Sequence, residues 1–194
     1  MKISIIGTGY VGLVTGLCLS EIGHDVICVD KEISKIKKIN NCVPIIHENG
    51  ITRLLKKNIN KNFIATNNLS KAVKNSSISI IAVGTPFRNN KIDIKYVKIA
   101  AKQIGRAIKE KKEFHVIVVK STVVPGTTDK IIKKIVEKES GMKVGLDFGL
   151  SMNPEFLREG EAVNDFMYPD RIIIGSSDVQ TERILVKMYN LFKG

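Results

Sequence analysis

Tryptophan is absent from the sequence, cysteine occurs only three times, and no apolar run approaches the ~18 residues that a membrane-spanning helix needs. An odd number of cysteines (Cys18, Cys28 and Cys42) argues against a disulfide framework and for reduced thiols. They show no paired ligand spacing, so we expect no metal site. The first six residues are typical of a strand rather than of a charged leader. These absences make the cytoplasm the expected location and argue against a membrane as partner.

Acidic residues are also scarce, with 19 aspartates and glutamates against 31 lysines and arginines, a formal net charge of +12. Such a balance attracts polyanions in general. The lysines are scattered over polar stretches such as 35–38 and 109–112, and no basic patch is interleaved with aromatic residues. We therefore favour a solvated, lysine-rich surface over nucleic-acid binding and expect no nucleic-acid partner.

Short apolar runs alternate with helical patterns, which is typical of βαβ units and of a parallel sheet covered on both faces. With 43% apolar residues, the chain can bury a full core. Strands are expected at 2–6, 25–29, 63–66, 78–83, 116–119, 148–152 and 172–174. Helices are expected at 11–22, 32–40, 52–57, 97–108, 131–136 and 181–192. The predicted fold class is α/β, one Rossmann-like domain over residues 1–194 with a doubly wound, mainly parallel sheet and helices on both faces.

A glycine-rich turn, Gly7–Gly12 (GTGYVG), directly follows the first strand and opens the first helix. In this context the G-x-G-x-x-G pattern indicates dinucleotide binding. Gly7 permits the tight turn, Gly9 lets the backbone approach a pyrophosphate, and Gly12 lets the helix pack against the strand. The free N–H groups and the positive dipole end of the helix attract the phosphates. A glycine-rich turn without a ligand is the alternative, and the end of the next strand argues against it.

Asp30 ends the second predicted strand, where a carboxylate accepts hydrogen bonds from the adenosine ribose hydroxyls and repels an added 2′-phosphate. This position favours NAD over NADP as the cofactor. Lys31 and Lys35 weaken the argument, because a nearby cation accommodates a phosphate, but no arginine replaces the acid. The alternative is that Asp30 only caps the helix that follows.

Three further segments follow the carboxyl ends of predicted strands, where doubly wound sheets bind their ligands. They are Val83–Pro86 (VGTP), Lys120–Thr127 (KSTVVPGT) and Asn153–Gly160 (NPEFLREG). A fold alone does not fix a function, so these segments carry the functional argument. With GTGYVG, and in this order, they closely resemble the UDP-glucose/GDP-mannose dehydrogenase family. A later stretch, Asp165–Gly175 (DFMYPDRIIIG), resembles the UDP-glucose branch more than the GDP-mannose branch.

Members of this family oxidise C6 of a nucleotide-linked hexose twice to a carboxylate, with two NAD and a cysteine thioester intermediate. The resemblance therefore implies NAD as cofactor and a nucleotide sugar, UDP-glucose first, as substrate. UDP-N-acetylmannosamine and GDP-mannose are the alternatives. The cofactor-binding residues that it implies are Gly7, Gly9, Tyr10, Val11, Gly12, Asp30, Lys35, Val83, Gly84, Thr85, Pro86, Ser121, Thr122 and Glu159.

The resemblance also implies three catalytic residues. Thr122 orients a water or relays a proton, Glu155 is the general base that helps water hydrolyse the thioester, and Glu159 contacts both NAD and the sugar. The implied sugar-binding residues are Glu155, Phe156, Leu157, Arg158 and Glu159. General chemistry agrees, since both steps need a proton acceptor and a carboxylate beside a cofactor can be tuned toward neutrality. In a helix Glu155 and Glu159 would share a face, and carboxylates that merely complement a helix N-terminus are the competing interpretation.

The pattern departs from the family in two places. The family's nucleophilic cysteine lies far downstream of NPEFLREG, after a lysine and an asparagine, in a central helix and sugar-binding domain that this sequence does not include. Cys18, Cys28 and Cys42 all precede NPEFLREG and lack a neighbouring base suited to thiolate formation. The family usually places a proline where Asn49 stands, so the geometry of that loop stays open.

We therefore expect a fragment, a split gene product or an isolated domain that binds NAD but has no turnover by itself. Its expected partners are the nucleotide sugar and the missing C-terminal half. The competing function is an orphan NAD-binding module with a sensing role or no activity, and a 6-phosphogluconate or hydroxyacyl-CoA dehydrogenase leaves NPEFLREG unexplained. Because the family dimerises through its central helix, we predict a monomer or an exposed apolar patch near Tyr189, Leu191 and Phe192.

Overall fold

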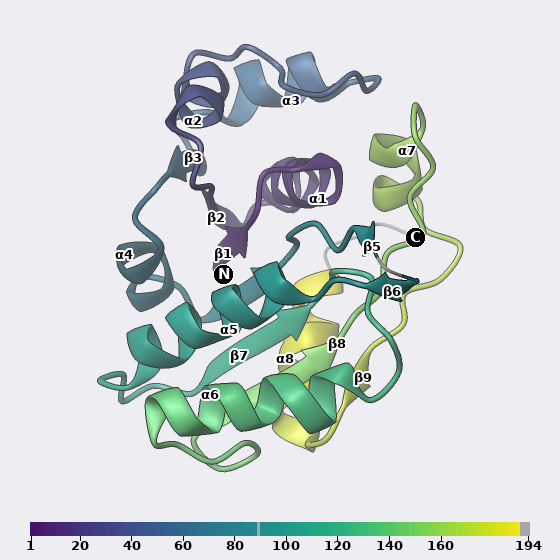
Figure 1. The fold of residues 1–194 in the computed structure, drawn as a ribbon. Helices are drawn as coiled ribbons and strands as arrows, with labels where there is room; N and C mark the ends of the chain where they lie inside the picture. Colours follow the sequence, from purple (N-terminus) through teal and green to yellow (C-terminus); the bar gives the residue numbers. More distant parts are fainter. Residues whose placement is uncertain (89, 191–194) are drawn as a thin grey trace.

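The computed structural model describes residues 1–88 and 90–190 and consists of one sheet with helices on both faces (Figure 1). Within these residues the sheet has seven strands, in the order β3-β2-β1-β4-β7-β8-β9. They are β1 (Lys2–Ile6), β2 (Asp25–Val29), β3 (Phe63–Thr66), β4 (Ile78–Ile81), β7 (His115–Val119), β8 (Phe148–Met152) and β9 (Gly175–Ser176). All neighbouring pairs are parallel except β8 and β9. A separate hairpin joins β5 (Phe87–Arg88) to β6 (Lys91–Ile92).

The helices divide between the two faces of the sheet. On one face, buried residues of α1 (Tyr10–Glu21), α2 (Ile33–Asn40), α3 (Ile51–Asn58), α7 (Ala162–Met167) and α8 (Val179–Tyr189) share a core cluster with the central strands. On the other face lie α4 (Leu69–Lys74), α5 (Lys95–Ile108), a π-helical turn η1 (Thr128–Ile132) and α6 (Lys133–Ser140). Figure 1 shows α5 and α6 side by side across β7 and α8 behind the sheet. The described part of the chain contains no helix with the length and apolar character needed to cross a membrane.

Alternation within the strands explains why both faces are covered. In β1, Ile3 and Ile5 belong to the first cluster and Ile6 to the second; all three are buried. The other central strands repeat this pattern, so they present apolar side chains to both layers of helices. The buried, β-branched runs that predicted parallel strands therefore have their expected environment, and the α/β fold class is confirmed.

The strand order reverses beside β1. The chain lays down β1, β2 and β3 in one direction and then returns to add β4 on the other side of β1. At such a reversal the connections leave the carboxyl ends of the two central strands in opposite directions and open a crevice between them. The segments singled out in the sequence follow β1, β2, β4, β7 and β8, so they gather at this edge.

One expected element, the strand at 172–174, is wrong. Residues 172–174 form no strand; the edge strand is the short antiparallel β9, while Ile172 and Ile173 are exposed. Residues 155–159 form no helix and extend as a loop between β8 and α7. The short helices α4 and α7 and the β5–β6 hairpin have no counterpart among the sequence-based predictions.

One of the two alternatives predicted for the chain end, an exposed apolar patch, has no support at Tyr189. Tyr189 is only 8% exposed, and its hydroxyl donates to Asn153 Oδ1 at 2.5 Å. Leu191 and Phe192 lie outside the described residues. The aromatic ring at the end of α8 therefore belongs to the core rather than to an interface.

Candidate functional site

The three glycines of the turn after β1 serve different structural purposes. Gly7 has a φ of +106°, and a Cβ built there would lie 2.6 Å from the Ala82 carbonyl oxygen. A Cβ at Gly12 would lie 2.0 Å from the Gly7 oxygen. At Gly9 an added Cβ would meet no atom within 4 Å. The fold itself therefore requires Gly7 and Gly12, whereas Gly9 keeps open a space beside the helix start that a close-lying ligand can use.

The start of α1 is an open anion site. The helix begins at Tyr10 with Gly9 as N-cap, no side chain caps it, and no acidic residue lies in its first turn. The backbone N–H of Leu13 donates to Gly9 O at 2.9 Å, while the N–H groups before it precede the first helical hydrogen bonds. Free N–H groups and the positive end of the helix dipole are thus available to a phosphate.

Beside this turn lies a cleft of about 520 Å³, here called the β1–β2 cleft. It brings together predicted cofactor residues from the segments that follow β1, β2 and β4. These are Gly7, Gly9, Asp30, Lys35, Val83 and Gly84. Apolar side chains of α5 and α4, including Ile99 and Leu69, form part of its wall. The cleft thus combines an apolar wall with a few polar groups, as ligand sites do.

Asp30 has the local contacts of a fixed carboxylate. Its Oδ2 accepts from the Thr8 N–H at 3.0 Å and from the Thr8 hydroxyl at 2.5 Å, and its Oδ1 accepts from the Glu32 N–H at 3.0 Å. Burial alone would raise the pKa of Asp30, but these hydrogen bonds outweigh it and hold the pKa below its usual value. Asp30 is not the helix cap, since α2 begins after Glu32. Oδ1 keeps acceptor capacity for a ribose hydroxyl, whereas Oδ2 already accepts two hydrogen bonds.

The neighbouring cations are engaged elsewhere. Lys35 Nζ pairs with Glu32 Oε1 at 3.1 Å, and Lys31 Nζ lies 4.9 Å from the centre of the Tyr96 ring. Neither contact is an ion pair with Asp30, although the charge of Lys35 adds a smaller effect to the hydrogen bonds that lower the pKa of Asp30. A 2′-phosphate at this position would therefore face a carboxylate rather than a free guanidinium.

The segments after β4 and β7 are tied together. Ser121 is buried, and its hydroxyl donates to Val83 O at 2.7 Å. Thr122 is exposed, and its side chain makes no hydrogen bond among residues 1–88 and 90–190. Neither Ser121 nor Thr122 lines the β1–β2 cleft, and the same holds for Thr85 and Pro86. The Thr122 hydroxyl is thus free for a ligand or a water, while Ser121 acts within the fold.

The predicted sugar-binding segment lines a second cleft of about 470 Å³, here called the β8 cleft. Glu155, Phe156, Leu157 and Arg158 all contribute to it. The stretch Tyr168–Ile172 forms another side of the same cleft, and Arg171 places its guanidinium 4.8 Å from the centre of the Phe156 ring. Glu159 lines neither cleft and is exposed.

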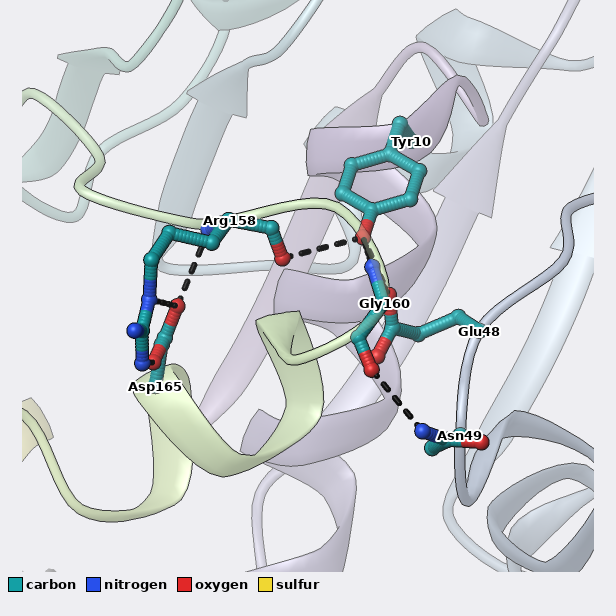
Figure 2. Close-up of polar contacts among 6 residues, drawn as sticks. All are labelled: Tyr10, Glu48, Asn49, Arg158, Gly160 and Asp165. Carbon is teal, nitrogen blue, oxygen red and sulfur yellow. Dashed lines mark hydrogen bonds and ion pairs between the residues drawn. The ribbon is translucent and has the colours of Figure 1, made fainter.

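Arg158 is held in place by Asp165 of α7. Its backbone N–H donates to Asp165 Oδ2 at 2.9 Å, and its guanidinium donates to both Asp165 oxygens (Figure 2). The lowered pKa of Asp165 follows first from the Arg158 side chain and then from its backbone N–H. Asp165, the first residue of the DFMYPDRIIIG stretch singled out in the sequence, therefore anchors the preceding loop.

Lys120 is a functional candidate that the sequence analysis did not single out. It is 3% exposed, lines the β8 cleft and donates to Asn153 Oδ1 at 3.1 Å. No carboxylate lies within ion-pair distance of it in the described residues. Burial lowers its pKa to about 8, against a smaller opposing effect of Glu155. In the sequence Lys120 directly follows the apolar run 116–119, which by itself does not show that the lysine is buried.

None of the three cysteines lies in either cleft. Cys18 and Cys28 are fully buried, and burial raises the pKa of both, that of Cys18 to about 12. Cys42 is half-buried in the loop after α2. No group of His, Cys, Asp or Glu in the described residues is arranged to hold a metal ion. The thiols available here are therefore not placed as nucleophiles.

The strand order and the glycine turn define a class, the dinucleotide-binding domains of oxidoreductases. Comparison with known proteins narrows it. The chain belongs to the UDP-glucose/GDP-mannose dehydrogenase family, because the model of that family's NAD binding domain matches residues 1–193.

Individual relatives agree with this assignment. The chain is 44% identical over 191 residues to the GDP-mannose 6-dehydrogenase of Pseudomonas aeruginosa, covering 97% of this chain and 44% of that protein. It is 44% identical over 193 residues to the UDP-glucose 6-dehydrogenase TuaD of Bacillus subtilis, covering 98% and 41%. A crystal structure of a ternary complex of the Pseudomonas aeruginosa enzyme superposes with a TM-score of 0.97 at 42% identity, covering 100% of this chain and 45% of that one. The chain thus spans under half the length of these relatives.

NAD is confirmed as the cofactor of this family domain. The local structure fits it, because an open Gly9, an uncapped helix start and a fixed Asp30 carboxylate surround one cleft. The roles of the individual residues toward NAD and the sugar remain predictions.

Proposed function

We propose that the chain supplies the NAD-binding half of a nucleotide-sugar 6-dehydrogenase, with UDP-glucose as the sugar nucleotide. The observation that carries the proposal is that two clefts lie at the same edge of the sheet, after the carboxyl ends of its strands. The β1–β2 cleft holds the cofactor-binding pattern, and the β8 cleft is lined by Glu155 and its neighbours. The other half, with the thiol nucleophile and most of the sugar site, lies outside residues 1–194 in this proposal.

Each set of residues has a distinct task on the cofactor side. The N–H groups at the start of α1 bind the pyrophosphate, and Asp30 accepts hydrogen bonds from the adenosine ribose. Val83–Pro86 and Ser121 shape the approach toward the nicotinamide. When bound, NAD supplies the hydride acceptor for alcohol oxidation.

On the sugar side Thr122 and Glu155 have separate tasks. Thr122 orients a water through its free hydroxyl, and Glu155 at the β8 cleft accepts the proton from water during thioester hydrolysis. The peptide groups of Phe156–Glu159 bind the sugar, and the Glu159 carboxylate reaches toward both ligands. Since none of Cys18, Cys28 and Cys42 lines either cleft, the chain by itself binds ligands and does not turn over.

The choice of nucleotide sugar has support on both sides. The Asp165–Gly175 stretch favours UDP-glucose, and Asp165 shapes the loop that lines the β8 cleft. The similarity to GDP-mannose 6-dehydrogenases favours GDP-mannose as the second candidate. Competition between the two sugar nucleotides for the NAD-loaded chain separates them.

Calorimetric titration tests the cofactor half of the proposal. We expect NAD to bind and NADP to bind at least about tenfold more weakly, because the added phosphate meets the Asp30 charge. Asp30→Ala removes charge-assisted hydrogen bonds of ~1.5–3 kcal/mol, which weakens NAD binding by about 10- to 100-fold.

Glu32→Ala is the matched control, since Glu32 lines the same cleft but pairs with Lys35. It should leave NAD affinity nearly unchanged. Absence of NAD binding to the wild-type chain would contradict the proposal and leave these motifs with a role in the fold alone.

A further inference from the structure

Three segments far apart in the sequence meet beside the cofactor turn (Figure 2). Tyr10, in the first turn of α1, donates its hydroxyl proton to Glu48 Oε2. The N–H of Gly160 donates to Tyr10 Oη at 3.0 Å and to Glu48 Oε2 at 2.9 Å. The Gly160 carbonyl oxygen accepts from Asn49 Nδ2 at 3.0 Å. Both backbone polar groups of Gly160 are thus bound by side chains more than a hundred residues away.

The contacts fix a loop on both sides of one acidic residue. Arg158 is anchored to Asp165 through its backbone N–H and its guanidinium. Gly160, with a φ of +88°, is anchored to Tyr10 and Glu48. Between them Glu159 is exposed, and its side chain forms no hydrogen bond or ion pair with the described residues. The contacts of the loop therefore fix Arg158 and Gly160, and the Glu159 carboxylate between them has no partner among the described residues.

Local stability does not explain why a glutamate stands at position 48. Its Oε1 is buried and has no hydrogen-bond partner in the described part of the chain. An unsatisfied buried acceptor is unfavourable, so a carboxylate at this position has a cost that an amide or an apolar group could avoid. Its Oε2, by contrast, joins the helix start to the loop. The unfavourable burial of Oε1 is explained if the role of Glu48 is to hold the loop at Gly160.

We propose that Tyr10 and Glu48 are positioning residues that clamp the Gly160 peptide to the first turn of α1 and so place Glu159 beside the cofactor turn. This inference deepens the proposed function, since it rests on the sugar-binding role given there to residues 155–159. The backbone of Tyr10 belongs to the anion site at the start of α1, while its side chain holds the loop. A single residue thus links the two ligand sites. Burial, followed by the hydrogen bond to Glu48, raises the pKa of Tyr10 to about 12, so its hydroxyl stays a donor at neutral pH.

Hydrogen exchange of the Gly160 amide, read by NMR, tests the clamp directly. Tyr10→Phe removes only the hydroxyl, and Glu48→Ala removes the carboxylate. Each variant should speed exchange at Gly160 by at least about tenfold, because the N–H loses an acceptor. Glu48→Gln keeps an amide oxygen in the same place and should restore most of the protection lost in Glu48→Ala.

Asn49→Ala is the matched control. Asn49 is exposed and contacts Gly160 through the carbonyl oxygen, so its removal leaves the acceptors of the Gly160 N–H intact. Its effect on exchange should be much smaller. NAD affinity should change by less than about threefold in Glu48→Gln, because Glu48 lies outside the glycine-rich turn and the backbone N–H groups of the helix start are unaltered.

The sugar ligand gives a readout that loop stability alone would not move. With NAD bound, saturation-transfer NMR with UDP-glucose and GDP-mannose should show sugar contact in the wild type and in Glu48→Gln, and reduced contact in Tyr10→Phe and Glu48→Ala. Equal sugar contact in all four proteins would overturn the positioning role.

The outcomes separate this inference from the proposed function. Unchanged Gly160 exchange in Tyr10→Phe and Glu48→Ala, or an equal increase in Asn49→Ala, would overturn the clamp even if NAD and sugar bind. Failure of the wild-type chain to bind NAD would refute the proposed function, whereas the Gly160 exchange rates would still decide whether the clamp exists. If Glu48→Ala does not fold, Tyr10→Phe and Glu48→Gln supply the comparison.

Discussion

Lys120 gives a prediction whose size follows from its surroundings. Its ammonium is almost fully buried, with Asn153 Oδ1 as its hydrogen-bond partner and the Phe166 ring 5.8 Å away. Burial lowers the pKa from 10.5 to about 8. This difference corresponds to ~3 kcal/mol of free energy that opposes folding when the lysine is charged.

The sign of the pH dependence follows from proton binding. The unfolded chain binds the Lys120 proton more tightly than the folded chain, so stability rises with pH between the folded and unfolded pKa values. The penalty is complete below about pH 8 and is relieved as the pH rises toward 10.5. Lys120→Met keeps the apolar stem and removes the charge, and Tyr189 still donates to Asn153 Oδ1. We expect this variant to be ~2–3 kcal/mol more stable than wild type at pH 7.

Urea denaturation of both proteins at pH 7 and pH 10 measures the effect. Only the difference between the two proteins is compared, which removes the contributions of other titrating groups. That difference should shrink by ~2 kcal/mol at pH 10, where most of the penalty is relieved. Lys120→Met that is less stable than wild type at pH 7, or a difference independent of pH, would refute the reasoning. NAD affinity should be unaffected, because Lys120 lines the β8 cleft and not the β1–β2 cleft.

Two further predictions each compare residues of one type in different environments. Gly12→Ala should lower the free energy of unfolding by at least ~1–3 kcal/mol in chemical denaturation, because its Cβ would overlap a backbone oxygen. Gly9→Ala should keep wild-type stability but weaken NAD binding in calorimetry, since its Cβ enters open space beside the helix start; equal stability loss in both variants would contradict this. With a thiol reagent at pH 8, Cys42 should react far faster than Cys18 and Cys28, whose pKa values burial raises. A second fast thiol in the folded chain would show that one of the buried strands or helices opens.

Local rules were sufficient for the elements that bury apolar runs. The strands at 2–6, 25–29, 63–66 and 148–152 have the predicted bounds, because each is a short apolar run between polar or glycine-containing turns. The same criterion failed at 172–174, where the run is apolar but Ile172 and Ile173 lie at the surface. There the Ile173 carbonyl accepts from Asn153 Nδ2 instead of from a strand.

The loop after β8 shows a second limit of local patterns. Glu155 and Glu159 have helical spacing, yet backbone N–H groups of this loop donate to side chains outside it. The Arg158 N–H donates to Asp165 and the Gly160 N–H to Tyr10 and Glu48, so i to i−4 hydrogen bonds are not formed. Predicted cofactor residues that follow β1, β2 and β4 did come together in one cleft, since the backbone topology brings them there, whereas Ser121 and Thr122 after β7 do not line it. Contacts that depend on distant side chains, such as that of Glu48, left no signal of their own.

Lys120 illustrates why the least predictable residues are candidates for function. A lysine is by default a solvated residue, and nothing local indicates that this one is enclosed by Asn153, Phe166 and Tyr189. Its burial breaks the rule that interior charges are paired, and the stability of the rest of the domain must offset the cost. A sequence optimised for stability alone would place methionine there. The buried charge that lines the β8 cleft is therefore a reason to measure sugar-nucleotide binding in Lys120→Met beside its stability, because a variant that gains stability and loses binding would show what the charge is for.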